Sequence, residues 1–334
     1  MSGTGASKTT RSFGWLRLMV ATLLIAAGGL AVFFELRRPA YQSPLTSDIL
    51  VLGDSQLSFG AGPVLRDFFS DLKAQCANAV TEKSDLQLLS KRRFAMIGTR
   101  STSLQSWVTH QGRAWELLCH KDKKWGVNAS TWGTVKPPDK RYVQIGEGEN
   151  FQFCRQPETP LQNLFATGYY RPRLLMIFVG GNGAGRLARR PRAAGQDVKR
   201  FVRDLPPGTG CLFMMTAPVL SAEDNAIRGR AQDNLRAAFA AEAKTCSFVD
   251  GHTPATRAAI EGQVQYFKRD DAGNVTDPHH ANSAAAQKFL AARRGALCRA
   301  IVEQLRKSRK LPAKQSQSPT TRPGLQFAAR AKHP

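Results

Sequence analysis

Three short segments, far apart in the sequence, hold residue types that together can carry out acyl transfer. Residues 53–55 (Gly-Asp-Ser) follow the apolar run 49–52, residues 180–182 (Gly-Gly-Asn) follow the apolar run 174–179, and residues 277–280 (Asp-Pro-His-His) lie near the C-terminal end. A serine hydroxyl becomes a good nucleophile when a histidine removes its proton, and a carboxylate fixes the tautomer of that histidine. The three segments therefore predict a serine hydrolase.

Each candidate residue has one role in this chemistry. We assign Ser55 as the nucleophile, because it follows a strand and a glycine, a context that exposes a side chain at the edge of a sheet. His280 is the predicted base and Asp277 orients it, although the adjacent His279 could face the serine if the turn is shifted. The Asn182 side chain can donate a hydrogen bond to the oxyanion that forms when the serine attacks.

The three segments resemble the motif blocks of the SGNH hydrolases, also called GDSL esterases and lipases. Residues 49–56 match the first block, with Gln56 where the name-giving leucine would stand. Residues 178–182 are similar to the Gly-x-Asn block, and residues 277–280 are similar to the closing Asp-x-x-His block. All three occur in the family order, so the resemblance covers about residues 48–300.

The resemblance also implies an oxyanion hole. Its donors would be the backbone N–H groups of Ser55 and Gly98 together with the Asn182 side chain. Gly98 directly follows the apolar run 94–97 and is the best match to the glycine block of the family. Gly183 follows Asn182 where many members carry an aspartate, so we expect the asparagine to be kept and the local turn to differ.

The fold and activity that the resemblance implies are those of the family. We expect an α/β fold, a flavodoxin-like three-layer sandwich with a central parallel sheet. The implied function is an esterase that cleaves short acyl esters such as O-acetyl groups, on carbohydrate or on a small molecule, without a metal or another cofactor. Two alternatives remain open: a polysaccharide O-acyltransferase of the same fold, and a glycan-binding module without turnover.

Hydrophobic periodicity supports the same class of fold. Short apolar runs alternate with helical patterns, which predicts parallel strands with helices on both faces of the sheet. The expected strands are 49–52, 94–97, 174–179, 211–217 and 246–249, and the expected helices are 63–79, 193–205, 223–243 and 283–305. A stretch of about 115–160, rich in Trp, Gly and Lys, interrupts this alternation, and we interpret it as an insertion within a domain of residues 48–305.

The N-terminal segment predicts a membrane anchor. Residues 18–34 are uncharged and mostly apolar, and about 20 such residues span a bilayer. Lys8, Arg11 and Arg17 precede this run, so residues 1–12 are expected in the cytoplasm, 13–36 in the membrane and 37–47 in a linker. A cleaved signal peptide, and hence a secreted protein, is the alternative. The membrane anchor and the signal peptide both place the predicted catalytic domain outside the cytoplasm, in the periplasm or the extracellular space.

Six cysteines agree with an exported domain, because an even number permits disulfides. Cys76 and Cys298 are expected on the first and last helices, which share a face of such a sheet. Two further pairs suggest themselves, since two cysteines bracket the insertion and two begin successive strands: Cys119 with Cys154, and Cys211 with Cys246. Six free thiols are the alternative. The chain has no Cys-x-x-Cys spacing, so a structural zinc site is not expected.

The formal net charge of +23 is partly local. Residues 306–334 contain eight Lys or Arg and no acidic residue, which predicts a flexible basic tail. Such charge favours weak association with anionic polysaccharide or lipid head groups. No pattern typical of specific nucleic-acid binding accompanies it.

Overall fold

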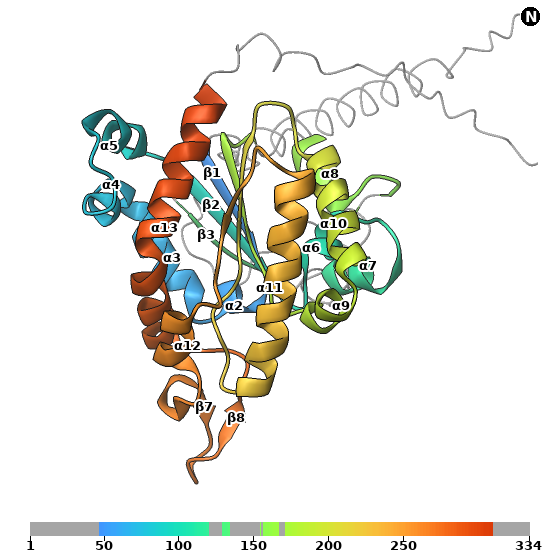
Figure 1. Cartoon of the computed structure of the whole chain (residues 1–334), viewed down its shortest axis with the longest axis vertical. Coiled ribbons are helices and arrows are strands. Elements are labelled where there is room, and N and C mark those ends of the chain that lie inside the picture. The colour runs from blue at the N-terminus through green and yellow to red at the C-terminus, as the bar shows by residue number, and fades with distance from the viewer. Residues whose placement is uncertain (1–46, 120–128, 134–153, 155, 167–170, 310–334) are drawn as a thin grey trace, which may run out of the picture. The chain divides into compact units, whose positions relative to one another are not determined.

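The computed structural model describes residues 47–119, 129–133, 154, 156–166 and 171–309 (Figure 1). The expected anchor at 13–36, nearly all of the linker at 37–47 and most of the insertion lie outside these residues. Among the helices that are described, none is both long and apolar enough to cross a bilayer.

A six-stranded sheet forms the centre of the domain, with the strand order β3-β2-β1-β4-β5-β6. Five strands are parallel, and β3 pairs antiparallel with β2 at one edge. The bounds are β1 (Ile49–Gly53), β2 (Phe94–Thr99), β3 (Ala129–Gly133), β4 (Leu174–Phe178), β5 (Gly210–Met214) and β6 (Ser247–Val249). Counting only the parallel strands, the order is 2-1-3-4-5, the order of flavodoxin-like sheets. The predicted α/β class with a central parallel sheet is confirmed.

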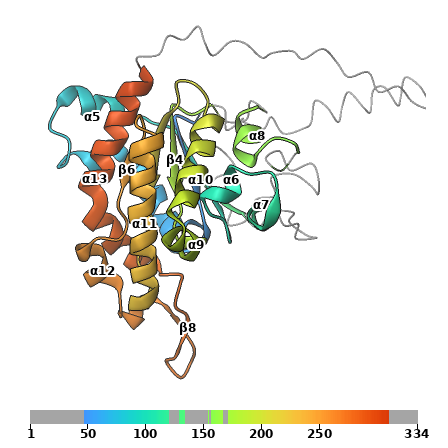
Figure 2. The same ribbon diagram turned by 45° about the vertical axis from the view of Figure 1, so that its right-hand side comes forward.

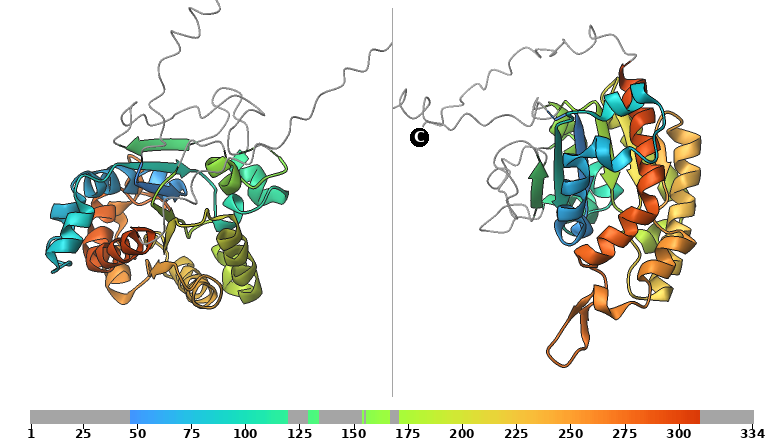
Figure 3. Two further views of the ribbon diagram at one scale, coloured as in Figure 1. Left: turned by 90° about the horizontal axis from the view of Figure 1, so that it is seen from above. Right: turned by 90° about the vertical axis from the view of Figure 1, so that its left-hand side faces the viewer.

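Alternate side chains of the buried strands enter two separate cores, and this alternation builds the layers. Ile49 and Val51 of β1 face one core, whereas Leu50 and Leu52 face the other. The first core is covered by α3 (Ala61–Ser70), α4 (Leu72–Cys76), α5 (Lys83–Leu89), α12 (Pro254–Ile260) and α13 (Ser283–Arg309). The second is covered by α6 (Leu104–Trp107), α7 (Gly112–Cys119), α8 (Pro160–Ala166), α9 (Ala184–Arg189), α10 (Pro191–Asp204) and α11 (Ala222–Glu242). The two groups of helices flank the sheet in Figures 2 and 3.

Several elements differ from the sequence-based expectation. The helix expected over 63–79 is divided into α3 and α4 at Asp71, because the Asp71 carboxylate accepts a hydrogen bond from the Ala74 N–H and caps a new helix. The strand β3 lies inside the insertion and was not predicted. The hairpin of β7 (Lys268–Arg269) and β8 (Val275–Asp277) was also not predicted, and it projects from the domain below α12 in Figure 1. The closing helix continues to Arg309, so residues 306–309 of the expected tail are helical.

All six cysteines form disulfides, in the pairs suggested by the sequence. Cys76 ends α4 and is bonded to Cys298 of α13, which fixes two helices of the same layer although 222 residues separate them. The other two bonds, Cys119–Cys154 and Cys211–Cys246, each join residues 35 positions apart. The alternative of six free thiols is excluded for this structure.

Candidate active site

Ser55 lies at the carboxyl end of β1, where the chain turns directly into the short helix α2 (Ser55–Ser58). The turn brings the backbone of Gly53 close to Leu57: a Cβ on Gly53 would lie 2.5 Å from the Leu57 Cδ2 atom. A larger residue at position 53 would therefore displace the helix that carries Ser55. The Gly-Asp-Ser sequence is thus explained by the geometry of a tight strand-to-helix turn.

Asp54 holds this turn in place, and within the described structure its carboxylate shares no hydrogen bond with the side chains of Ser55, Asp277 or His280. One of its carboxylate oxygens accepts a hydrogen bond from the Gln56 N–H at 2.8 Å, and the other accepts from the N–H groups of Gly180 and Gly181 at 3.3 and 3.5 Å. Asp54 is 1 % exposed. Burial raises the pKa of its carboxyl group, while these N–H donors and the positive charge of Arg228 oppose the rise. Asp54 therefore connects the first and second motif segments.

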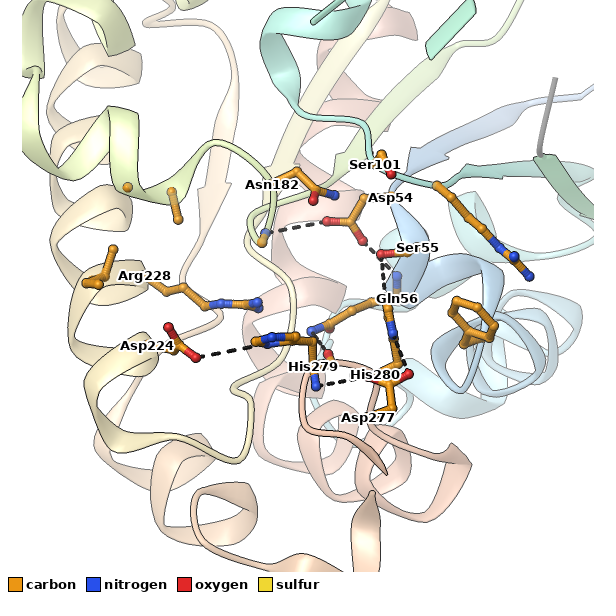
Figure 4. A pocket seen from close by; sticks show the side chains of 16 residues that line it. Asp54, Ser55, Gln56, Ser101, Asn182, Asp224, Arg228, Asp277, His279 and His280 are labelled. Atoms are coloured by element: carbon orange, nitrogen blue, oxygen red, sulfur yellow. Dashed lines mark hydrogen bonds and ion pairs between the residues drawn. The ribbon is translucent and has the colours of Figure 1, made fainter. Parts of the chain in front are cut away.

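Ser55, His280 and Asp277 form a continuous chain of hydrogen bonds (Figure 4). The His280 Nε2 atom lies 2.8 Å from the Ser55 hydroxyl oxygen, and His280 Nδ1 lies 2.7 Å from Asp277 Oδ2. The other Asp277 oxygen accepts from the backbone N–H groups of His279 and His280 at 3.1 Å each. Burial alone would raise the pKa of Asp277, but the bonds from His280 and the two backbone N–H groups outweigh it and hold that pKa below its ordinary value.

The adjacent histidine faces a different wall of the site. His279 Nδ1 lies 4.0 Å from Asp224 Oδ2 on α11, and Figure 4 shows its ring directed toward that helix. Asp277 Oδ1 binds both backbone N–H groups, so it fixes the turn in the register that presents His280 to Ser55. Of the two histidines that the sequence left as candidates, His280 is therefore the one in contact with the serine.

Asn182 reaches the site at the end of the loop that follows β4. Its side-chain amide donates one hydrogen bond to the Thr102 carbonyl at 3.0 Å, and a second N–H remains on the same nitrogen. The next residue, Gly183, has φ +80° and precedes α9. This left-handed conformation strains an aspartate but not a glycine, which explains Gly183 at this position.

Gly98 does not reach the site. It lies inside β2, opposite Gly53 of β1, and its carbonyl accepts a hydrogen bond from the Ser58 hydroxyl at 2.7 Å. A Cβ at Gly98 would lie 2.8 Å from the Ser58 nitrogen, so this glycine permits the close approach of α2 to the sheet. The loop after β2 instead brings Ser101, with φ +62°, to the site beside Asn182 (Figure 4). No glycine marks this position in the sequence.

Ser55, Asn182, Asp277 and His280 border one pocket of about 580 Å³, which we call the catalytic pocket after these candidate residues. Phe59 packs on His280 with ring centroids 4.6 Å apart, and the Arg100 guanidinium lies over the Phe59 ring, 4.5 Å from its centroid. The lining residues are Asp54, Ser55, Gln56, Phe59, Arg100, Ser101, Gly181, Asn182, Ala184, Gly185, Asp224, Ile227, Arg228, Asp277, His279 and His280. None of the described residues of the insertion is among them. The described part of the chain also contains no cluster of His, Cys, Asp and Glu suited to a metal ion.

Gln56 joins the turn that carries Ser55 to the loop after β5 and to the segment that carries His280, a role that the sequence did not reveal. Its side chain pairs with both the N–H and the carbonyl of Ala217, at 3.0 and 3.1 Å, and its Nε2 also donates to the His279 carbonyl at 3.4 Å. Gln56 is 6 % exposed. Its only signal in the sequence was the departure from the leucine of the family that this segment resembles. A buried amide at this position explains that departure.

Replacing Gln56 with methionine, which has a similar shape but no amide, is expected to lower both stability and turnover. Each buried backbone group of Ala217 that is left unpaired costs about 1–3 kcal/mol, and the segment that carries His280 loses a support. We expect a lower free energy of unfolding and, for any substrate, a kcat reduced by about tenfold. Denaturant titration and steady-state kinetics measure the two effects.

Gln232→Met is the matched control. Gln232 is also buried and makes three comparable bonds, with the N–H groups of Gly251 and His252 and the carbonyl of His252. These bonds lie outside the catalytic pocket, so this variant should lose stability and keep its kcat within about twofold. Equal losses of kcat in the two variants would mean that Gln56 supports only the fold.

His252, the histidine that follows Asp250-Gly251, does not line the catalytic pocket. It is 8 % exposed, and within the described structure neither ring nitrogen has a hydrogen-bond partner. Burial, together with the positive charges of Arg228 and Arg257, lowers its pKa to about 3. A ring that stays neutral in this position cannot act as a proton carrier for Ser55.

A comparison with protein-family models finds no match to this chain, and a comparison with curated proteins finds no significant match. The site is therefore interpreted from its own residues and geometry.

Proposed function

We propose that the protein is a serine esterase with an SGNH-type fold, which cleaves short acyl esters outside the cytoplasm. The observation that carries the proposal is the chain of hydrogen bonds from the Ser55 hydroxyl through His280 to Asp277. Nucleophile, base and orienting carboxylate within hydrogen-bond reach are the arrangement that activates a serine. The two segments that supply these groups are more than 200 residues apart and have no evident structural need to place them in line.

In the proposed reaction, the Ser55 oxygen attacks the ester carbonyl while its proton passes to His280 Nε2. The Asp277 carboxylate stabilises the resulting imidazolium and keeps Nδ1 protonated. The tetrahedral oxyanion accepts hydrogen bonds from the Ser55 N–H and from the second N–H of the Asn182 amide. The imidazolium then protonates the departing alcohol, and water, deprotonated by His280, resolves the acyl-enzyme. These steps need no metal or other cofactor.

Ser101 is the favoured source of a further backbone donor, in place of Gly98. Ser101 borders the catalytic pocket and lies on the same side of Ser55 as Asn182, whereas the Gly98 backbone belongs to the sheet. In the part of the chain that is described, the Ser55 N–H has no hydrogen-bond acceptor, which leaves it available to an oxyanion.

Labelling with a serine-directed phosphonate tests the proposal. The fluorophosphonate should form a covalent bond with the Ser55 oxygen, release fluoride and increase the mass of the peptide that contains residue 55. A membrane-impermeant version, applied to intact cells, should label the same residue, because the apolar run 18–34 is proposed to hold residues 48–305 outside the cytoplasm. Mass spectrometry of digested protein measures both reactions.

Ser55→Ala is the control for the site of labelling and should take no label. Labelling at another serine, or none in a protein that also cleaves no ester, contradicts the enzymatic proposal. Labelling only after the cells are opened contradicts the proposed location and leaves the chemistry intact.

A further inference from the structure

Arg228 places a buried positive charge in the wall of the catalytic pocket. It lies on the second turn of α11, one turn after Asp224, and its side chain extends from that helix toward the Ser55 side of the pocket (Figure 4). Arg228 is only 8 % exposed. The proposed acyl-transfer chemistry assigns it no task.

No group of opposite charge directly contacts the Arg228 guanidinium within the described structure. Its Nη1 atom is buried and has no hydrogen-bond partner, and no ion pair within the described structure includes Arg228. Asp54 attracts it from a distance, but that carboxylate is already bound by three backbone N–H groups. Asp224 also attracts it from a distance, although its side chain is 42 % exposed and faces His279.

A buried charge without a partner is costly, and arginine cannot avoid the cost by losing its proton. Burial lowers the pKa of Arg228, but a guanidinium remains charged at neutral pH. Proteins retain such groups where a ligand supplies the missing partner, and a guanidinium is suited to bind a planar carboxylate through two N–H donors. The unpartnered Nη1 atom therefore points to an anionic ligand.

The position of Arg228 relates this ligand to the reacting ester. Nη2 lies 3.1 Å from the point where a Cβ on Gly181 would stand, so the guanidinium packs against the residue that precedes Asn182. A side chain at position 181 would push the Arg228 guanidinium away from this backbone. The anion-binding group thus lies one residue from the proposed oxyanion donor, and it can reach a substituent near the scissile ester.

The charges around the pocket favour a monoanion. Among the described residues that line it, Asp54, Asp224 and Asp277 carry carboxylates, and Arg100 adds a second permanent positive charge. A dianionic phosphate would be repelled by three carboxylates, whereas a single carboxylate can pair with Arg228 alone. We propose that Arg228 binds a carboxylate of the substrate, and that the protein deacylates esters of acidic molecules, with the carboxylate a few bonds from the ester. This inference rests on the proposed esterase function.

Two matched esters test it in the full-length protein: 4-acetoxybenzoate, which carries a carboxylate, and 4-acetoxybenzamide, its neutral analogue. Each kcat/KM is divided by the uncatalysed rate in the same buffer. We expect the wild type to prefer the benzoate, and Arg228→Gln to lower kcat/KM for the benzoate by about 10- to 100-fold, the range for hydrogen bonds to a charged group. The benzamide should change by less than about threefold. Arg228→Lys keeps the charge without the paired donors and should be intermediate.

Arg230→Gln is the matched control, because it removes the same charge from an exposed position of α11 outside the pocket. The ratio of the two esters should stay unchanged. A wild type without preference for the benzoate, or an Arg228→Gln variant that loses activity on both esters equally, overturns the inference. If Arg228→Gln does not fold, the ratio for Arg228→Lys decides in the same way.

A binding measurement separates failure of this inference from failure of the esterase proposal. In the Ser55→Ala protein, we expect 4-hydroxybenzoate to bind at least tenfold more tightly than 4-hydroxybenzamide, as measured by calorimetric titration. Adding Arg228→Gln should abolish this difference in affinity. If the benzamide is cleaved and Ser55 is labelled, but the protein shows no preference for the carboxylate, the esterase proposal stands and the role of Arg228 is rejected. If neither ester is cleaved, carboxylate binding that depends on Arg228 still supports the inference, and its absence rejects it.

Discussion

Replacing Ser55 or His280 with alanine is expected to reduce kcat/KM for any ester substrate by about 10⁴-fold or more. Ser55 Oγ and His280 Nε2 are 2.8 Å apart, so each variant removes one partner of the same proton transfer. The double variant should lose no more than either single variant, because the two groups act as a unit. Steady-state kinetics with a chromogenic acetyl ester measures the loss, and circular dichroism checks the fold.

Two further variants locate the effect. Asn182→Ala removes one proposed oxyanion donor and should cost about 10²–10³ in kcat. His279→Ala removes the neighbouring ring, which faces Asp224, and should cost less than about tenfold. If His279→Ala were as damaging as His280→Ala, the assignment of the base would have to change. Full activity of Ser55→Ala would exclude the serine mechanism.

Removing the disulfide between Cys76 and Cys298 is expected to be the most destabilising change outside the active site. This bond joins residues 222 positions apart, and the entropy of closing so long a loop in the unfolded chain corresponds to about 5 kcal/mol. The Cys76→Ala, Cys298→Ala double variant should therefore unfold at a much lower denaturant concentration. Urea titration of both proteins gives the difference in the free energy of unfolding.

The Cys211→Ala, Cys246→Ala double variant is the comparison. Its loop is only 35 positions long, so the same entropy argument gives about 4 kcal/mol. Both pairs link elements of the domain, and Cys76, Cys298 and Cys211 are fully buried. An equal or larger loss in the second variant would show that packing around the sulfur atoms, and not loop length, determines the contribution of these bonds.

The sequence was sufficient for the five parallel strands of the sheet because they are mostly buried on both faces. Leu174–Phe178 is a continuous apolar segment, and each residue in it is buried in the structure. Such runs can be recognised without knowledge of their neighbours. The antiparallel strand Ala129–Gly133 could not be recognised in this way, because it lies at the edge of the sheet within a polar insertion.

The triad candidates followed from residue type and spacing, since Asp277 and His280 are close in the chain and Ser55 follows a strand. The choice between His279 and His280 depended on the turn that Asp277 Oδ1 fixes through two backbone N–H groups. Gly98 was placed by its position after an apolar run, but the sheet continues one residue beyond it and uses its backbone. Sequence patterns locate strand ends to within a few residues, and a site donor must be placed more closely than that.

The sequence by itself indicated the class of fold, the order of the five parallel strands along the chain and residues of the types that acyl transfer requires, and it suggested the cysteine pairs. These depend on local periodicity and on chemical type. Only the tertiary structure decided which histidine contacts Ser55, that Gln56 links the turn of Ser55 to the segment of His280, and that Arg228 places a buried charge in the wall of the pocket. Each of these depends on atoms brought together from distant parts of the chain, and their distances are set by packing that no local pattern encodes.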